Sequence, residues 1–285
     1  MLKSFCIKTN NIKILDYLVN EIENLEISNV YASRNSFKIY KNILIHYTGE
    51  QEEEFLHFLS SLITDLIVHF YEYVLVNRNL NTNYFYFDQI EKKQISTIVM
   101  TALKEKEYEE KYKVIYDNVY AFVLNYNTVI LDGFVNFRLK DYLELLDCAT
   151  NFGVNKFLIE QEYDEFIKLL RSYIETKKST VNTIHLIYSN QTCILLDAEK
   201  NVISLNKTVL DAKYLSDISF SSNDYALNTL LNILPKKLHI HIVDEEDDFI
   251  KTLKLIFGNR VCICDSCNMC KTYKLTKDLV HAEKD

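Results

Sequence analysis

A run of four cysteines carries the strongest chemical signal in the sequence. Cys262, Cys264, Cys267 and Cys270 fall within nine residues, and the chain has seven cysteines altogether. Thiolate sulfur is a preferred ligand of zinc and of iron–sulfur clusters, and C-x2-C spacing lets neighbouring sulfurs converge on one ion. The run therefore predicts a metal site, holding zinc or an iron–sulfur cluster. Two other interpretations stay open: a surface cluster of reduced thiols, or a redox disulfide between Cys267 and either Cys264 or Cys270.

Two histidines precede the cysteine run at a spacing typical of a strand. His239 and His241 are two residues apart, so both side chains of a strand would point to one face. Such a pair can bind a metal together with a nearby carboxylate, here Asp244 or Glu245. The alternative is that the histidines form the less buried face of an edge strand, with Ile240 in the core. We favour that alternative, because the pattern supplies only two clear ligands.

The surrounding pattern predicts a C-terminal α/β domain over residues 180–275 and a loose tail over 276–285. The predicted strands and helices are, in order, strands 183–188, 192–198 and 202–205, helix 224–234, strand 238–243, helix 246–257 and strand 260–264. The last strand–helix–strand succession predicts a parallel pair. The cysteine run would then begin at the end of the last strand.

The first 178 residues predict a different architecture. Residues 1–49 read as a small β-α-β-β unit, and residues 50–178 as a bundle of about five helices, with a polar loop at 77–83. Only four glycines and one proline are present, which favours long helices. Gly153 lies inside one helical pattern, where it would close a helix or mark a bend. The predicted fold class is α+β: a central helical bundle flanked by the β-α-β-β unit and the C-terminal α/β domain.

Composition and charge limit the classes of function. The formal net charge is −8 at pH 7 and no dense Lys/Arg run occurs, which argues against a nucleic-acid partner. The most apolar window, residues 62–76, is interrupted by charged residues and is too short to span a bilayer. The first residues have no signal-peptide pattern. We therefore expect a cytoplasmic protein, in which cysteines are thiols or metal ligands.

Two runs in the centre of the chain are distinctive. They read DGFVNFRLKDY (residues 132–142) and FLIEQEYDEFIKLLRSYI (residues 157–174). Both resemble signature runs of the YtxC-like family, with Asp132 in place of Glu, Ile159 in place of Val and Gln161 in place of Lys. The order of the other segments also fits, so the resemblance covers most of the chain. The signature residues, which we expect to be structural, are Asp132, Gly133, Phe134, Phe137, Arg138, Leu139, Lys140, Tyr142, Glu160, Glu162, Tyr163, Glu165, Phe166 and Arg171.

The resemblance implies a cytosolic protein of endospore-forming bacteria that is linked to sporulation by the family's name. It implies no established catalytic activity and supplies no catalytic residues. Among the signature residues, Arg138, Glu162 and Arg171 could form a pocket for an anionic ligand. An inter-helix network of salt bridges is the favoured alternative, because no nucleophile or general base accompanies them.

The resemblance implies a non-catalytic interaction protein rather than an enzyme. No nucleotide-binding, nucleophile-elbow or H-E-x-x-H motif occurs in the chain. The leading hypothesis is a cytoplasmic sporulation protein that acts through protein partners. One alternative is a metalloprotein whose cysteine cluster binds zinc or an iron–sulfur cluster, and another is an enzyme with an unrecognised pocket.

Overall fold

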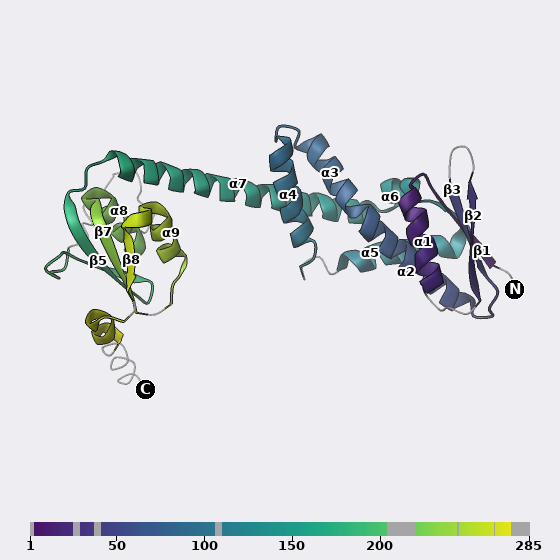
Figure 1. Cartoon of the computed structure of the whole chain (residues 1–285). Helices are drawn as coiled ribbons and strands as arrows, with labels where there is room; N and C mark the ends of the chain where they lie inside the picture. Colours follow the sequence, from purple (N-terminus) through teal and green to yellow (C-terminus); the bar gives the residue numbers. More distant parts are fainter. Residues whose placement is uncertain are drawn as a thin grey trace. The chain divides into compact units, whose positions relative to one another are not determined.

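The computed structural model describes residues 3–24, 29–36, 41–105, 110–203, 221–243, 245–264 and 266–274 (Figure 1). The chain divides into two compact units, Met1–Glu160 and Gln161–Asp285. The fold class predicted from the sequence, α+β, is confirmed, because helices and two four-stranded sheets are present. The predicted domain boundaries at residues 49 and 178 stay predictions. The predicted tail (276–285) and Asp244 lie outside the described residues.

The N-terminal unit begins with the predicted β-α-β-β succession. Its elements are β1 (Lys3–Thr9), α1 (Ile12–Asn24), β2 (Val30–Ser36) and β3 (Lys41–Tyr47). A short strand from the middle of the chain, β4 (Thr128–Ile130), completes the sheet in the order β2-β3-β1-β4. β4 pairs in parallel with β1, and the other pairs are antiparallel. The sequence contains no recognisable signal for β4, since three residues are too few to show alternation.

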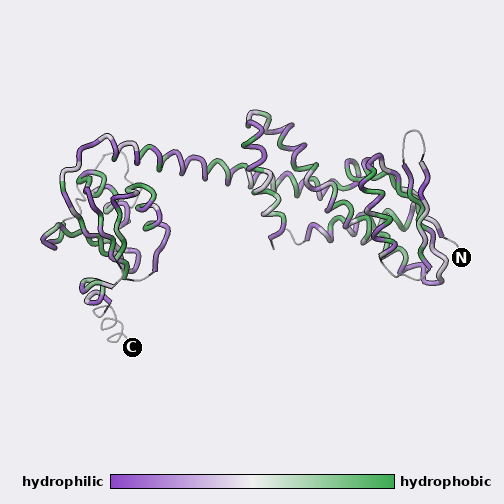
Figure 2. The backbone as a smooth tube through the Cα atoms, viewed as in Figure 1, coloured by the Kyte–Doolittle hydropathy of each residue, from purple (hydrophilic) through white to green (hydrophobic). Residues whose placement is uncertain are grey.

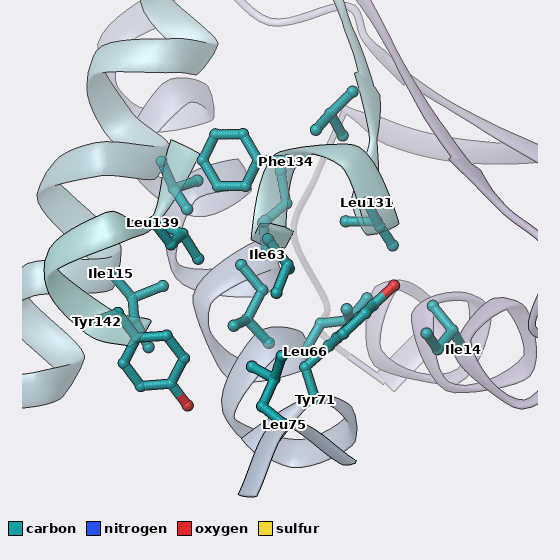
Figure 3. Close-up of a cluster of buried hydrophobic side chains, with 14 of the residues drawn as sticks. Ile14, Ile63, Leu66, Tyr71, Leu75, Ile115, Leu131, Phe134, Leu139 and Tyr142 are labelled. Carbon is teal, nitrogen blue, oxygen red and sulfur yellow. The ribbon is translucent and has the colours of Figure 1, made fainter. Parts of the chain in front are cut away.

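Helices cover this sheet and share one hydrophobic core with it. The helices are α2 (Glu52–Phe70), α3 (Glu72–Asn83), α4 (Gln89–Ala102), α5 (Glu110–Asn125), α6 (Leu131–Arg138) and the first part of α7 (Lys140–Thr176). Phe5, Ile7 and Ile45 of the sheet belong to the same buried cluster as Leu66 and Phe134 of the helices. Figure 3 shows part of this cluster, with side chains from α1, α2, α3, α5, α6 and α7 converging.

The polar run at residues 77–83 is helical, so its prediction as a loop was wrong. α3 continues to Asn83, and its Leu75, Val76 and Leu80 are buried. The polar side chains lie on the other face, where the Asn77 side-chain amide donates to the carbonyl of Tyr73 at 2.7 Å. Burial of apolar residues four to five positions apart outweighs the low helix propensity of asparagine.

α7 runs without interruption through Gly153, so this glycine neither closes the helix nor separates two helices. A Cβ atom on Gly153 would collide with the side chain of Val99 in α4. The glycine therefore allows α4 and α7 to approach closely, which is a packing role that the sequence pattern did not indicate. Figure 2 shows hydrophilic and hydrophobic residues alternating along α7.

The C-terminal unit contains the end of α7 and a second sheet. Its elements are β5 (Val181–Ser189), β6 (Thr192–Leu196), α8 (Ser222–Ile233), β7 (Pro235–Ile242), α9 (Asp248–Phe257), the 3-10 turn η3 (Gly258–Arg260) and β8 (Val261–Cys264). The strand order is β6-β5-β7-β8, with β5, β7 and β8 parallel and β6 antiparallel to β5. The predicted parallel pair is confirmed. One face of this sheet shares a buried core with α7, α8 and α9.

Within the described ranges, no single helix is long and apolar enough to cross a membrane. α2 and α3 meet these criteria only when they are taken together, and they are bent by 44° relative to each other.

Candidate metal centre

The second face of the C-terminal sheet carries the histidines and two of the cysteines. Strand alternation directs Leu186 and Ile240 into the core shared with the helices, and their neighbours to the opposite face. On that opposite face, His185 of β5 pairs with His239 of β7, which pairs with Cys262 of β8. The next row holds His241 of β7 opposite Cys264 of β8. These two rows lie toward the carboxyl ends of the parallel strands, where open α/β sheets place their sites.

The chain then turns back over this face. After β8 ends at Cys264, residues 268–274 are helical, and the backbone N–H of Lys271 donates to the carbonyl of Cys267 at 3.0 Å. Met269 packs against a small buried cluster of Ile187, Leu196 and Val243 on the second face of the sheet, and so does Tyr273. The turn and the helix therefore bring the last two cysteines of the run onto His241.

Four ligand atoms converge at this place: Nδ1 of His241 and the Sγ atoms of Cys264, Cys267 and Cys270. All four lie within 4.8 Å of one another. Nδ1 of His241 is 3.4 Å from Sγ of Cys267 and 3.5 Å from Sγ of Cys270. Sγ of Cys270 is 3.6 Å from Sγ of Cys267 and 3.9 Å from Sγ of Cys264. This group could hold a metal ion.

The spacing matches that of a tetrahedral zinc site. With Zn–S bonds of about 2.3 Å and Zn–N bonds of about 2.0–2.1 Å, tetrahedral geometry separates two sulfurs by about 3.8 Å and a sulfur from a nitrogen by about 3.5 Å. The four measured distances lie between 3.4 and 3.9 Å. His241 and Cys270 are buried, at 4% and 1% exposed, whereas Cys264 and Cys267 are half-buried, so the position between the ligands is partly closed to solvent.

A third histidine, His185, contacts the ring of His241 on the edge opposite the cysteines. Nε2 of His241 lies 2.9 Å from Nδ1 of His185, on the side of the ring away from the cysteines. The ring of His185 is stacked on that of His239, with centroids 5.1 Å apart and planes at 21°. His241 therefore has one ring nitrogen directed at the sulfur atoms and the other directed at a hydrogen-bonding partner.

The local environment sets the protonation of the ligands. Burial, together with smaller contributions from the nearby His185, His239 and Lys200, lowers the pKa of His241 to about 4, so the ring is neutral at pH 7 and can bind a metal. The backbone N–H of Cys270 donates to Sγ of Cys267 and lowers the pKa of that thiol. Burial raises the pKa of Cys270 to about 12 in the absence of a cation. A bound divalent ion would deprotonate that thiol.

The structure brings together three of the four cysteines singled out in the sequence. Cys262 lies on the same face as Cys264 but one row away, opposite His239, and it is exposed and outside the group. His241 takes the fourth position. The His-x-His pattern had identified it as a possible ligand, but with Asp244 or Glu245 as partners. Glu245 is exposed and does not belong to the group.

The first signature run lies in the N-terminal unit, and some of its residues belong to the buried core. Phe134, Leu139 and Tyr142 are buried (Figure 3). The hydroxyl of Tyr71 donates to the carboxylate of Asp132 at 2.7 Å. Gly133 is half-buried, and the exposed residues of the run are Asp132, Phe137, Arg138, Lys140 and Asp141.

The second signature run is largely exposed. Glu160, the last residue of the N-terminal unit, and Glu162, Glu165 and Arg171 of the C-terminal unit are all exposed. The hydroxyl of Tyr163 lies 2.8 Å from that of Thr252, and Phe166 is 50% exposed. Arg138 belongs to the N-terminal unit and Glu162 and Arg171 to the C-terminal unit, and among the described residues of each unit none of the three forms an ion pair.

Comparison with known proteins gives two matches. The family model described as "YtxC-like family" matches residues 57–262. The chain is also 22% identical over 191 residues to "Uncharacterized protein YtxC" of Bacillus subtilis (strain 168), which covers 64% of this chain and 67% of that protein. No solved structure matches. The range matched by the family model ends at Cys262, so three cysteines of the metal group lie beyond it.

Proposed function

The chain belongs to the YtxC-like family, and for this member we propose that the C-terminal unit is a zinc-binding domain. One Zn²⁺ would be held by His241, Cys264, Cys267 and Cys270. The observation that carries the proposal is the convergence of their four ligand atoms within 4.8 Å, with four of the six separations at 3.4–3.9 Å, close to those of a tetrahedral zinc site. In a surface cluster of unrelated thiols, we would not expect a buried histidine from a neighbouring strand to lie among the sulfur atoms.

The geometry favours one ion over an iron–sulfur cluster. In a cluster, the protein sulfurs bind different iron atoms and are separated by the cluster itself. Here each of the four ligand atoms is close to the other three, which leaves room for a single ion. Among single ions, a site of three thiolates and one imidazole in tetrahedral geometry is typical of zinc.

The proposed role of the zinc is structural. All four positions of the tetrahedron are taken by protein atoms, whereas catalytic zinc keeps one position for water or substrate. The ligands come from β7, from the end of β8 and from the turn and helix that follow. Zinc would therefore fasten residues 266–274 to the second face of the sheet, and its binding energy would contribute to folding of this unit.

The cellular role that we propose is that of a non-catalytic protein acting in sporulation through protein contacts in the cytoplasm. What supports it is the resemblance of the two signature runs to the family, together with a metal site whose ligands leave no open position. Cross-linking of the protein in sporulating cells, followed by mass spectrometry, tests this role. A partner that crosslinks in the wild type supports the proposal, whereas substrate turnover by the purified protein would argue against it.

Metal analysis of anaerobically purified protein, with an ultraviolet–visible spectrum, tests the zinc proposal. We expect one equivalent of zinc per chain, and its loss in Cys270→Ser and in His241→Ala. Cys262→Ser is the matched control, because it removes an exposed thiol of the same run that lies outside the group. Iron with sulfide absorption would favour a cluster instead. Zinc content that is unchanged in Cys270→Ser, or lost in Cys262→Ser, would overturn the proposed ligand set.

A further inference from the structure

His185 holds a position that the proposed ligand set does not explain. It lies on β5, 56 residues from His241 in the sequence, and its Nδ1 is 2.9 Å from Nε2 of His241. This contact links two strands across the face of the sheet that carries the metal group. The ring of His239 is stacked on that of His185, with centroids 5.1 Å apart, but His239 does not belong to the metal group.

The orientation of His241 determines its required tautomer. Because Nδ1 faces Sγ of Cys267 and Sγ of Cys270, Nδ1 must carry the lone pair that would bind the metal. Neutral imidazole then carries its proton on Nε2. That Nε2–H is directed at His185, whose Nδ1 can accept it when the proton of His185 is on its own Nε2.

We infer that His185 is a positioning residue of the metal site: by accepting the Nε2–H of His241, it holds the tautomer and ring orientation that metal binding requires. The inference rests on the proposed zinc site. A metal-bound histidine whose second nitrogen donates a hydrogen bond is a stronger ligand, and its ring needs no reorientation when the metal binds. His185 itself does not touch the metal.

The test compares zinc affinity, measured by competition with a chromogenic chelator, in three variants of the full chain. His185→Leu removes the acceptor, and we expect a loss of affinity of about 10- to 100-fold. His185→Asn keeps an acceptor, since its side-chain oxygen can occupy the place of Nδ1, and should restore most of the affinity. His239→Leu is the matched control on the same face, because it removes a stacked ring without removing the acceptor.

A readout of the tautomer separates positioning from packing. In protein labelled with ¹⁵N-histidine, long-range ¹H–¹⁵N spectra identify which ring nitrogen of His241 carries the proton. We expect the Nε2–H tautomer in the wild type and in His185→Asn, both with and without zinc, and a mixture of tautomers in metal-free His185→Leu. Absorption bands of the Co²⁺-substituted protein should shift in His185→Leu, since the field of the imidazole ligand changes.

The outcomes distinguish this inference from the zinc proposal. If the wild type binds zinc and His185→Leu binds it equally well, the inference is wrong and the zinc site stands. If His185→Leu and His185→Asn are equally weakened, His185 acts through packing and the inference is likewise overturned. If the wild type binds no zinc, the proposed function fails. The tautomer of His241 in the metal-free protein still decides whether His185 orients the ring.

Discussion

Tyr142 of α7 donates its hydroxyl hydrogen to the carboxylate of Glu72 in α3 at 3.2 Å, across 70 residues of sequence. Both residues are buried, and Nζ of Lys111 in α5 lies 2.9 Å from the same carboxylate. Lys111 also donates to the carbonyl of Leu103 at 2.8 Å. A residue of the first signature run is therefore hydrogen-bonded to the Glu72–Lys111 ion pair, and the three side chains link α3, α5 and α7. This arrangement explains Tyr142 without a catalytic role.

Replacing Lys111 with Met should destabilise the N-terminal unit by about 3–5 kcal/mol, because it leaves the Glu72 carboxylate buried and unpaired. Urea denaturation followed by circular dichroism measures the change. The double variant Glu72→Gln/Lys111→Met should recover much of the loss, since no unpaired charge remains. Tyr142→Phe is a milder control, expected to cost about 1.5–3 kcal/mol for one hydrogen bond to a charged group. A neutral effect of Lys111→Met would contradict the buried ion pair.

Gly153→Ala should destabilise the protein, although alanine is the better helix former by about 1 kcal/mol. The added Cβ would collide with Val99, and overpacking of a core costs about 1–3 kcal/mol. Combining it with Val99→Ala should make the effect of the glycine substitution less unfavourable or reverse it. Thermal unfolding of the two single variants and the double variant gives this coupling. Independent, additive effects would show that the two helices do not meet at Gly153.

Removal of the metal should release residues 266–274 from the sheet. Their attachment depends on the proposed zinc ligands and on the small apolar cluster formed with Met269 and Tyr273. Hydrogen–deuterium exchange with and without EDTA measures the change. We expect amide protection in residues 268–274 to fall by at least about tenfold, while protection in α2 and α5 stays the same. Equal protection in both conditions would mean that packing alone holds the segment.

Cys193 should resist alkylation although it is a free thiol. It is 5% exposed, and burial together with the nearby Asp247 raises its pKa to about 12. The reactive thiolate is therefore scarce at neutral pH, and raising the pH to about 9 should not make the thiol react. Cys148 and Cys262, which are exposed, provide the comparison. Iodoacetamide labelling followed by peptide mass spectrometry measures this difference. Labelling of Cys193 at the rate of Cys262 in folded protein would contradict the buried position.

Local patterns in the sequence were sufficient to predict the fold class and most of the helices and strands. The alternation around His239 and His241 correctly predicted a strand, β7. The strand after the following helix, β8, was correctly predicted to pair with β7 in parallel. Those features depend on side-chain periodicity, which is a local property. Where composition and burial disagreed, as in α3, the polar composition misled the prediction. There the deciding contacts come from other helices.

The sequence by itself identified the cysteine run as a candidate metal site, because the type and spacing of the ligand residues are properties of the sequence. Only the tertiary structure decided which atoms meet. The parallel register of β7 and β8 places His241 opposite Cys264, and Cys262 one row away opposite His239. Cys262 therefore lies one row, or about 7 Å along the strand, away from Cys264 and outside the metal group. Register, and the contact of His241 with His185 on a third strand, follow from how the sheet assembles. No local pattern of residues encodes them.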